Sequence, residues 1–132
     1  MNIPNLNTNA SSTLRGAVVS KVNGSGESVS FTFKYGNTTL ASLPIGYGGD
    51  NSFSRREFTT AVNAFAPTSS NFTIKVDFNR NNPSYVGFLD YIEVNARSFL
   101  KFYDKLQFQD INSIGAGNVS EFQVTSFPNK GI

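Results

Sequence analysis

The amino-acid sequence predicts an all-β domain, a two-sheet β-sandwich of jelly-roll or related Greek-key order. Its 132 residues include 13 Phe and 5 Tyr but no Trp, and aromatic side chains suit the half-buried, pleated surface of a sheet. Apolar and polar residues alternate in several short segments, as in a strand with one buried face. Turns rich in Gly, Asn and Ser separate these segments at the spacing of about 8–12 residues that is typical of sandwiches and barrels.

The first third of the chain contains two predicted strands and a hairpin. Leu14–Val22 is the first strand candidate and ends at a turn rich in Asn and Gly. In Val29–Tyr35 aromatic and aliphatic residues alternate with Ser, Thr and Lys, so one face is expected to be buried. Gly36 and Asn37 form a tight turn that leads into Thr38–Leu43, the expected hairpin partner.

The middle of the chain is less regular. Pro44–Ser52 is rich in glycine and is expected to be a plain loop, because a phosphate-binding loop needs a following helix and usually a Lys. Phe53–Phe65 has some apolar residues at near-helical spacing, but its threonines favour an irregular strand. Phe72–Phe78 returns to alternation and is the second clear strand.

Val86–Ala96 is the most apolar stretch and is predicted to be a central strand. Phe88, Ile92 and Val94 are expected to face the core. Asp90 would share this buried face, which is unfavourable unless the carboxylate is paired or lies at a bulge. The alternative is that the register is shifted by one residue and Asp90 lies on the solvent face.

Three shorter strands complete the prediction at Phe99–Tyr103, Leu106–Gln109 and Ser120–Phe127. The chain thus has about eight predicted strands, the number expected of a jelly roll. We expect a flexible polar leader at residues 1–13 and a single β-sandwich domain at residues 14–132. Since no closing feature marks the end of the sequence, we also expect the domain to be part of a larger protein.

The composition argues against catalysis by this chain. It has neither Cys nor His, so it lacks a thiol nucleophile, an imidazole base and the usual zinc ligands. We therefore predict no catalytic residue, no cofactor and no metal site. The formal net charge of +2 is spread along the sequence, which does not favour nucleic-acid binding. No apolar run approaches the length of a transmembrane segment.

Two tyrosines are candidates for ligand contacts. Sugar-binding jelly rolls present exposed aromatic rings, and Tyr47 and Tyr85 lie at positions beside predicted turns or strand ends. The competing use of such rings is to complete the core or to shield its rim. A carbohydrate-binding module is therefore the alternative function that the residues themselves allow.

The second half of the chain carries a longer motif in three runs. They are Gly-Phe-Leu-Asp-Tyr-Ile-Glu-Val-Asn-Ala-Arg at 87–97, Leu-Gln-Phe-Gln-Asp at 106–110 and Ser-Ile-Gly-Ala-Gly-Asn-Val-Ser-Glu-Phe at 113–122. Together they resemble the β-sandwich region that precedes the peptidase domain of the type IX secretion sortase. That family is a gingipain-like group of cysteine peptidases from the surface of Bacteroidetes. The resemblance covers Phe72–Phe127, and the first half carries no matching motif.

The resemblance implies an exported, outer-membrane-associated parent at the cell surface. Such a parent removes C-terminal sorting domains from secreted cargo and helps to attach the cargo to lipopolysaccharide. Its catalytic Cys and His would lie beyond Ile132, and no position in this sequence matches them. The chain would then be a non-catalytic accessory domain, with the peptidase domain of the same parent, secreted cargo proteins or surface glycans as its partners.

The matched run also suggests a structural contact. Asp90 and Arg97 both lie within it, and we predict that they form a polar pair that fixes a strand end or a domain junction. A buried, paired Asp90 should contribute well over about 1 kcal/mol to stability.

Overall fold

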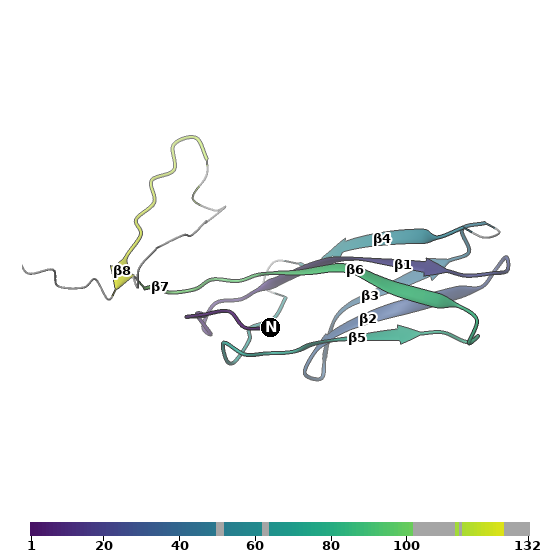
Figure 1. The fold of residues 1–132 in the computed structure, drawn as a ribbon. Helices are drawn as coiled ribbons and strands as arrows, with labels where there is room; N and C mark the ends of the chain where they lie inside the picture. The colour runs from purple at the N-terminus through teal and green to yellow at the C-terminus, as the bar shows by residue number, and fades with distance from the viewer. Residues whose placement is uncertain (50–51, 62–63, 102–112, 114, 126–132) are drawn as a thin grey trace, which may run out of the picture.

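The computed structural model describes residues 1–49, 52–61, 64–101, 113 and 115–125. Two antiparallel three-stranded sheets pack together, and a third sheet, which has two strands, lies beyond one end of them (Figure 1). This arrangement confirms the all-β sandwich. A jelly roll has about eight strands in its two sheets, whereas the described part of the chain contributes six to the sandwich.

The described strands differ in length, and their order in the sheets differs from their order along the chain. They are β1 (Thr13–Lys21), β2 (Ser28–Tyr35), β3 (Thr38–Gly46), β4 (Ser54–Thr59), β5 (Ile74–Asn79), β6 (Val86–Asn95), β7 (Leu100–Lys101) and β8 (Val124–Thr125). The first sheet has the order β4-β1-β6 and the second β3-β2-β5. Within the sandwich only β2 and β3 form a hairpin, and every other connection passes from one sheet to the other. This order depends on long-range pairing, so the local sequence pattern did not predict it.

The core lies between the two central strands. Val29, Phe31 and Phe33 of β2 are buried, as their alternation predicted. Aromatic contacts extend this core to both sheets. The ring centroids of Phe33 and Phe58, on β4 of the opposite sheet, lie 4.4 Å apart, and those of Phe31 and Phe78, on the neighbouring strand β5, lie 4.8 Å apart. Each such buried side chain stabilises the fold by roughly 1.5–3 kcal/mol relative to an exposed one.

The two flanks of the sandwich differ. On one side β3 and β4 come close together, and we call this side the closed flank. On the other side β5 and β6 approach each other much less, and we call it the open flank. Neither β5 nor β6 contributes a fully buried side chain, whereas Ile45 of β3 is 1% exposed.

The predicted Gly-rich loop begins later than expected. Strand β3 continues to Gly46, so the first residues of Pro44–Ser52 are paired with β2. Pro44 cannot donate a backbone hydrogen bond, and its position on an edge strand makes this harmless. The predicted turn between β2 and β3 is present, and Gly36 has a φ of 54°, a conformation that favours glycine.

The segment before β1 is bound to the sandwich, which contradicts the prediction of a flexible leader at residues 1–13. Leu6 is buried in the core at 6% exposure. The Met1 carbonyl accepts a hydrogen bond from the Phe72 amide at 3.0 Å. Isolated antiparallel bridges join Asn2 to Asn71, Leu6 to Ser98 and Ser12 to Phe65. A polar, Asn-rich composition therefore did not prevent this segment from pairing with the body of the domain.

Strand β6 lies at the edge of its sheet, so the prediction of a central strand was wrong (Figure 1). Its pairing with β1 is irregular: Ala17 faces Tyr91, while the next residue, Val18, faces Leu89. Asp90 is therefore the extra residue of a β-bulge. The structure shows both the bulge and the solvent-exposed position that the sequence left open, since the Asp90 side chain is 45% exposed.

The bulge changes which side chains of β6 face inward. Ile92 and Val94, which follow it, pack against the core as predicted. Phe88, which precedes it, is 55% exposed, so its predicted core position was wrong. One additional residue shifts the period-two pattern and moves the side chains before it to the opposite face.

The predicted C-terminal strands are only partly covered by the described residues, because residues 102–103 and 126–127 lie outside them. Phe99–Tyr103 is represented by β7 and Ser120–Phe127 by β8, which pair in parallel. The predicted strand Leu106–Gln109 lies outside the described residues.

Candidate functional site

Exposed aromatic rings and ion pairs gather on the outer face of the β4-β1-β6 sheet. Strand register brings them together, because Val19 of β1 faces Arg55 on one side and Phe88 on the other. We call this surface the aromatic face. Its residues are Arg15, Lys21, Phe53, Arg55, Glu57, Phe88, Asp90 and Tyr91.

Two phenylalanines form the apolar part of the aromatic face. Phe53 is 57% exposed and Phe88 is 55% exposed, and their ring centroids lie 6.2 Å apart. The Lys21 ammonium lies 5.9 Å from the Phe53 ring centroid. Large rings that remain this exposed contribute little to the core, whereas contiguous exposed apolar surface is typical of interaction sites.

An ion pair crosses the sheet beside these rings. Arg55 of β4 donates two hydrogen bonds to Asp90 Oδ2, from Nε at 3.1 Å and from Nη2 at 3.0 Å. It also donates to Glu57 on its own strand. These carboxylates, Glu57 first and then Asp90, raise the pKa of the Arg55 guanidinium above its ordinary value. Both edge strands are thereby linked across β1 at the position of the bulge.

Arg15 and Tyr91 form a second cation–aromatic contact on the same face. The Arg15 guanidinium lies 5.7 Å from the Tyr91 ring centroid, and its Nε donates to the Tyr91 hydroxyl at 3.2 Å. The hydrogen bond to Tyr91 is the main cause of the raised Arg15 pKa. The face therefore has rigid rings with charged groups around them, a combination suited to protein contacts.

The structure does not bring Asp90 and Arg97 together. They are separated along an extended chain that rises about 3.3 Å per residue, so their backbones lie roughly 23 Å apart. Arg97 follows the end of β6, and its carbonyl accepts a hydrogen bond from the Asn7 amide at 2.9 Å. The partner of Asp90 is Arg55, which sequence reasoning missed because the pairing of β4 and β6 around β1 has no local signal.

The two tyrosines that were predicted as ligand contacts differ in exposure. Tyr85 is 3% exposed and its hydroxyl donates to the Asn23 carbonyl at 3.0 Å, so its ring is part of the core and is not presented to a ligand. Tyr47 is half-buried just after β3, and its amide donates to the Glu27 carbonyl at 3.2 Å. Neither lies among the residues of the aromatic face.

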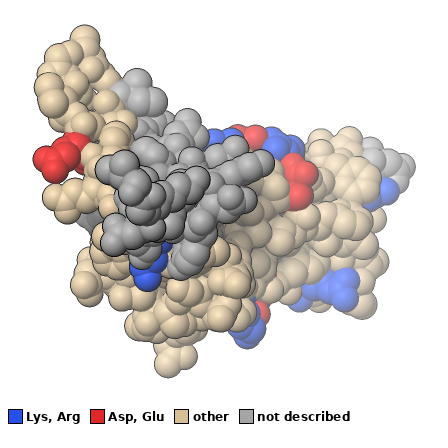
Figure 2. Space-filling model, turned by 60° about the vertical axis from the view of Figure 1, so that its left-hand side comes forward, with Lys and Arg blue, Asp and Glu red and all other residues tan. Residues whose placement is uncertain are grey.

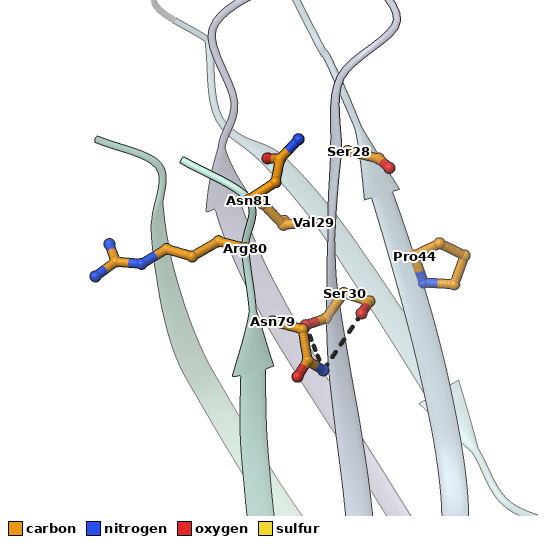
Figure 3. Close-up of a pocket in the computed structure, with 7 residues that line it drawn as sticks. All are labelled: Ser28, Val29, Ser30, Pro44, Asn79, Arg80 and Asn81. Atoms are coloured by element: carbon orange, nitrogen blue, oxygen red, sulfur yellow. Dashed lines mark hydrogen bonds between the residues drawn. The ribbon is translucent and has the colours of Figure 1, made fainter. Parts of the chain in front are cut away.

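A polar hollow of about 280 Å³ lies on the other sheet (Figure 3). It is lined by Ser28, Val29, Ser30, Pro44, Asn79, Arg80 and Asn81. The Asn79 amide donates to the Thr32 hydroxyl at 3.2 Å, and Arg80 donates to the Tyr85 carbonyl at 2.6 Å. Because these donors are engaged within the protein and no aromatic residue lines the hollow, it is a poor platform for a sugar ring.

Further findings for the described residues concern metal sites, membrane-spanning helices and clustered surface charge. No group of three or more acidic residues lies close enough there to hold a metal ion. In the same part of the chain no helix has the length and apolar character needed to cross a membrane. On the face shown in Figure 2, positive and negative groups are scattered over a mainly uncharged surface. Such a surface lacks the basic stripe typical of nucleic-acid binding.

Comparisons with known proteins find no match to this chain among protein-family models, curated proteins or solved structures.

Proposed function

We propose that this chain is a non-catalytic interaction domain that positions a surface cysteine peptidase, or its secreted cargo, through the aromatic face. The observation that carries the proposal is the exposed pair Phe53 and Phe88 beside the Arg55–Asp90 ion pair. Exposed rings surrounded by paired charges resemble the centre and rim of a protein interface. The choice of parent rests on the sequence resemblance to the sortase region.

The geometry supports contact with a protein surface more than binding of a small ligand. The aromatic face lies on a sheet, and its two phenylalanines each retain more than half of their exposed area. Burying most of that area on a partner would stabilise a complex by about 1–2 kcal/mol for each ring. The charged groups already have partners within the domain, so their desolvation in an interface is less costly than that of isolated charges.

The peptidase chemistry in this proposal belongs to another domain of the parent. A first test is to read the natural coding sequence beyond Ile132. The proposal expects a peptidase-sized segment with a Cys nucleophile and a His base. A natural protein that ends near this position would contradict the assignment of the parent.

A second test measures binding directly. The segment that follows is produced separately, and its affinity for this chain is measured by calorimetry. We expect Phe88→Asp and Phe53→Asp each to weaken binding at least tenfold. Thr39→Asp, an exposed substitution on β3 of the opposite sheet, is the matched control and should bind like the wild type.

The carbohydrate alternative makes a different prediction for the same variants. Binding to bacterial or plant glycans that is lost in Phe88→Asp, without any binding to the peptidase segment, would overturn the proposal in its favour. Equal binding of the peptidase segment by all variants would show that the aromatic face is not the contact surface.

A further inference from the structure

Asn23 and Gly24 form the only Asn-Gly pair in the sequence. They begin the turn that carries the chain from β1 in one sheet to β2 in the other. Gly24 has a φ of 120°, a conformation that residues with a side chain rarely adopt, so the turn requires a glycine here. Asn-Gly pairs are typical of turns for this reason. The same pair is also the most reactive setting for an asparagine side chain.

An asparagine loses ammonia when the amide nitrogen of the next residue attacks its side-chain carbon Cγ. The new N–C bond closes a five-membered succinimide ring, the Cγ–Nδ2 bond breaks, and Nδ2 leaves as ammonia with the proton of the attacking amide. Water then opens the ring at either of its carbonyls and gives an aspartate or an isoaspartate. A following glycine favours ring closure because it has no Cβ atom to obstruct the attack.

The structure leaves both reacting groups of this pair accessible. Asn23 and Gly24 are exposed. Among the described residues, the Gly24 amide donates no hydrogen bond and the Asn23 side chain forms none. By contrast, the side-chain amide of Asn81 donates to the Glu27 carboxylate at 2.8 Å. The Asn23 side chain is therefore free to rotate towards the Gly24 nitrogen.

The backbone of Asn23 has a contact that the reaction would alter. Tyr85 is 3% exposed, and its hydroxyl donates to the Asn23 carbonyl at 3.0 Å. In an aspartate product this carbonyl stays in the main chain. In an isoaspartate product the main chain runs through Cβ and Cγ and gains one carbon, so the former carbonyl becomes part of a carboxylate outside it. Displacing the acceptor of a buried hydroxyl destabilises the fold.

We propose that Asn23 is a site of spontaneous deamidation, and that its isoaspartyl product loosens the junction between β1 and β2 at Tyr85. The reaction consumes water and needs no other co-reactant. Because the aromatic face does not include Asn23, this proposal is independent of the proposed contact with a partner.

Mass spectrometry of the full chain, stored in a slightly alkaline buffer, tests the reaction. Trypsin releases the fragment 22–34, in which Asn23 is the only asparagine. We expect this fragment to gain the mass of one deamidation at least tenfold faster than position 37. Asn37 is the matched control, an exposed asparagine of the β2–β3 turn, because the β-branched Thr38 that follows it obstructs ring closure. Equal rates at the two positions, or an Asn23 that stays unmodified, would overturn the proposed site.

Urea denaturation tests the effect of the product on the fold. The isoaspartyl fraction is isolated from the stored protein by chromatography and identified by labelling with an isoaspartyl methyltransferase. The matched control is Asn23→Asp, which carries the added charge but not the added main-chain carbon. We expect the isoaspartyl fraction to unfold at a lower urea concentration than Asn23→Asp. The same unfolding midpoint for both would overturn the loosening at Tyr85.

Discussion

The closed and open flanks of the sandwich are built from similar strands but reach different degrees of burial. At the closed flank Ile45 of β3 is 1% exposed and Phe58 of β4 packs against Phe33. At the open flank Leu89 of β6 is 44% exposed although it lies on the core side. The difference shows that the core side of the sandwich is more completely covered at Ile45 than at Leu89, and that the open flank retains exposed apolar surface.

The largest expected effect is the contrast between Ile45 and Leu89 as stability determinants. Ile45→Ala should lower the free energy of unfolding by about 2–5 kcal/mol, because it leaves a cavity in a closed core. Leu89→Ala should cost less than about 1 kcal/mol, as for a partly exposed side chain. Urea denaturation followed by circular dichroism measures both values. Similar losses in the two variants would show that the flanks are equally packed.

A second expected effect concerns Gly87 of β6, because aromatic rings of the other sheet pack directly against its Cα position. A Cβ atom at Gly87 would lie 2.6 Å from ring atoms of both Phe31 and Phe78. Gly87→Ala should therefore destabilise the fold by about 1–3 kcal/mol through overpacking. Gly46→Ala is the matched control, since its nearest neighbour is a backbone oxygen at 3.9 Å. Equal stability of the two variants would mean that the sheets separate easily at this point.

A contrast between the central strand β2 and the edge strand β6 explains what the sequence could predict. In β2 the alternation is uninterrupted, and it gave the buried residues Val29, Phe31 and Phe33 correctly. In β6 the bulge at Asp90 breaks the same pattern, and Phe88 was placed in the core for that reason. The aspartate in the apolar pattern suggested a bulge at position 90, but a bulge depends on the partner strand, so the local pattern did not show that Phe88 would face outward.

The candidate site was less predictable than the fold. Phe53, Arg55 and Phe88 come from segments that are distant in sequence and are brought together by the order β4-β1-β6. The sequence showed an unusual aspartate at position 90 but could not show that its partner would be Arg55. Tyr85 was predicted to contact a ligand because it is an aromatic residue beside a turn, but its side chain is buried.

A smaller effect is expected from the ion pair beside the open flank. Asp90 is partly exposed and its contacts with Arg55 are open to solvent, so Asp90→Ala should cost less than about 1 kcal/mol. A double-mutant cycle with Arg55→Ala measures the coupling free energy of the pair. The sequence predicted a larger loss because the Asp90 carboxylate was expected to be buried. A loss of unfolding free energy well above about 1 kcal/mol in Asp90→Ala would support that assumption.

The smallest expected effect is the pH dependence that Asp77 gives to the open-flank strand β5. Asp77 forms ion pairs with Lys75 at 3.0 Å and with Lys34 of the central strand β2 at 3.1 Å. The hydrogen bond from Lys75, followed by that from Lys34, holds the pKa of the Asp77 carboxyl below its ordinary value. The folded state thus favours the charged carboxylate. The stability that the charged Asp77 carboxylate contributes is fully present above the ordinary aspartate pKa of about 3.9. This stability is lost as the pH falls through the lowered pKa of the folded state.

The variant Asp77→Asn tests this contribution, because it cannot titrate. The decrease in the free energy of unfolding between about pH 6 and about pH 3 should be smaller in the variant than in the wild type. Thr39→Asn, an exposed substitution at the closed-flank strand β3, should leave the wild-type decrease unchanged. If Asp77→Asn follows the wild-type curve, the ion pairs of β5 do not contribute to its attachment, and its apolar contacts with β2 hold that edge of the open flank.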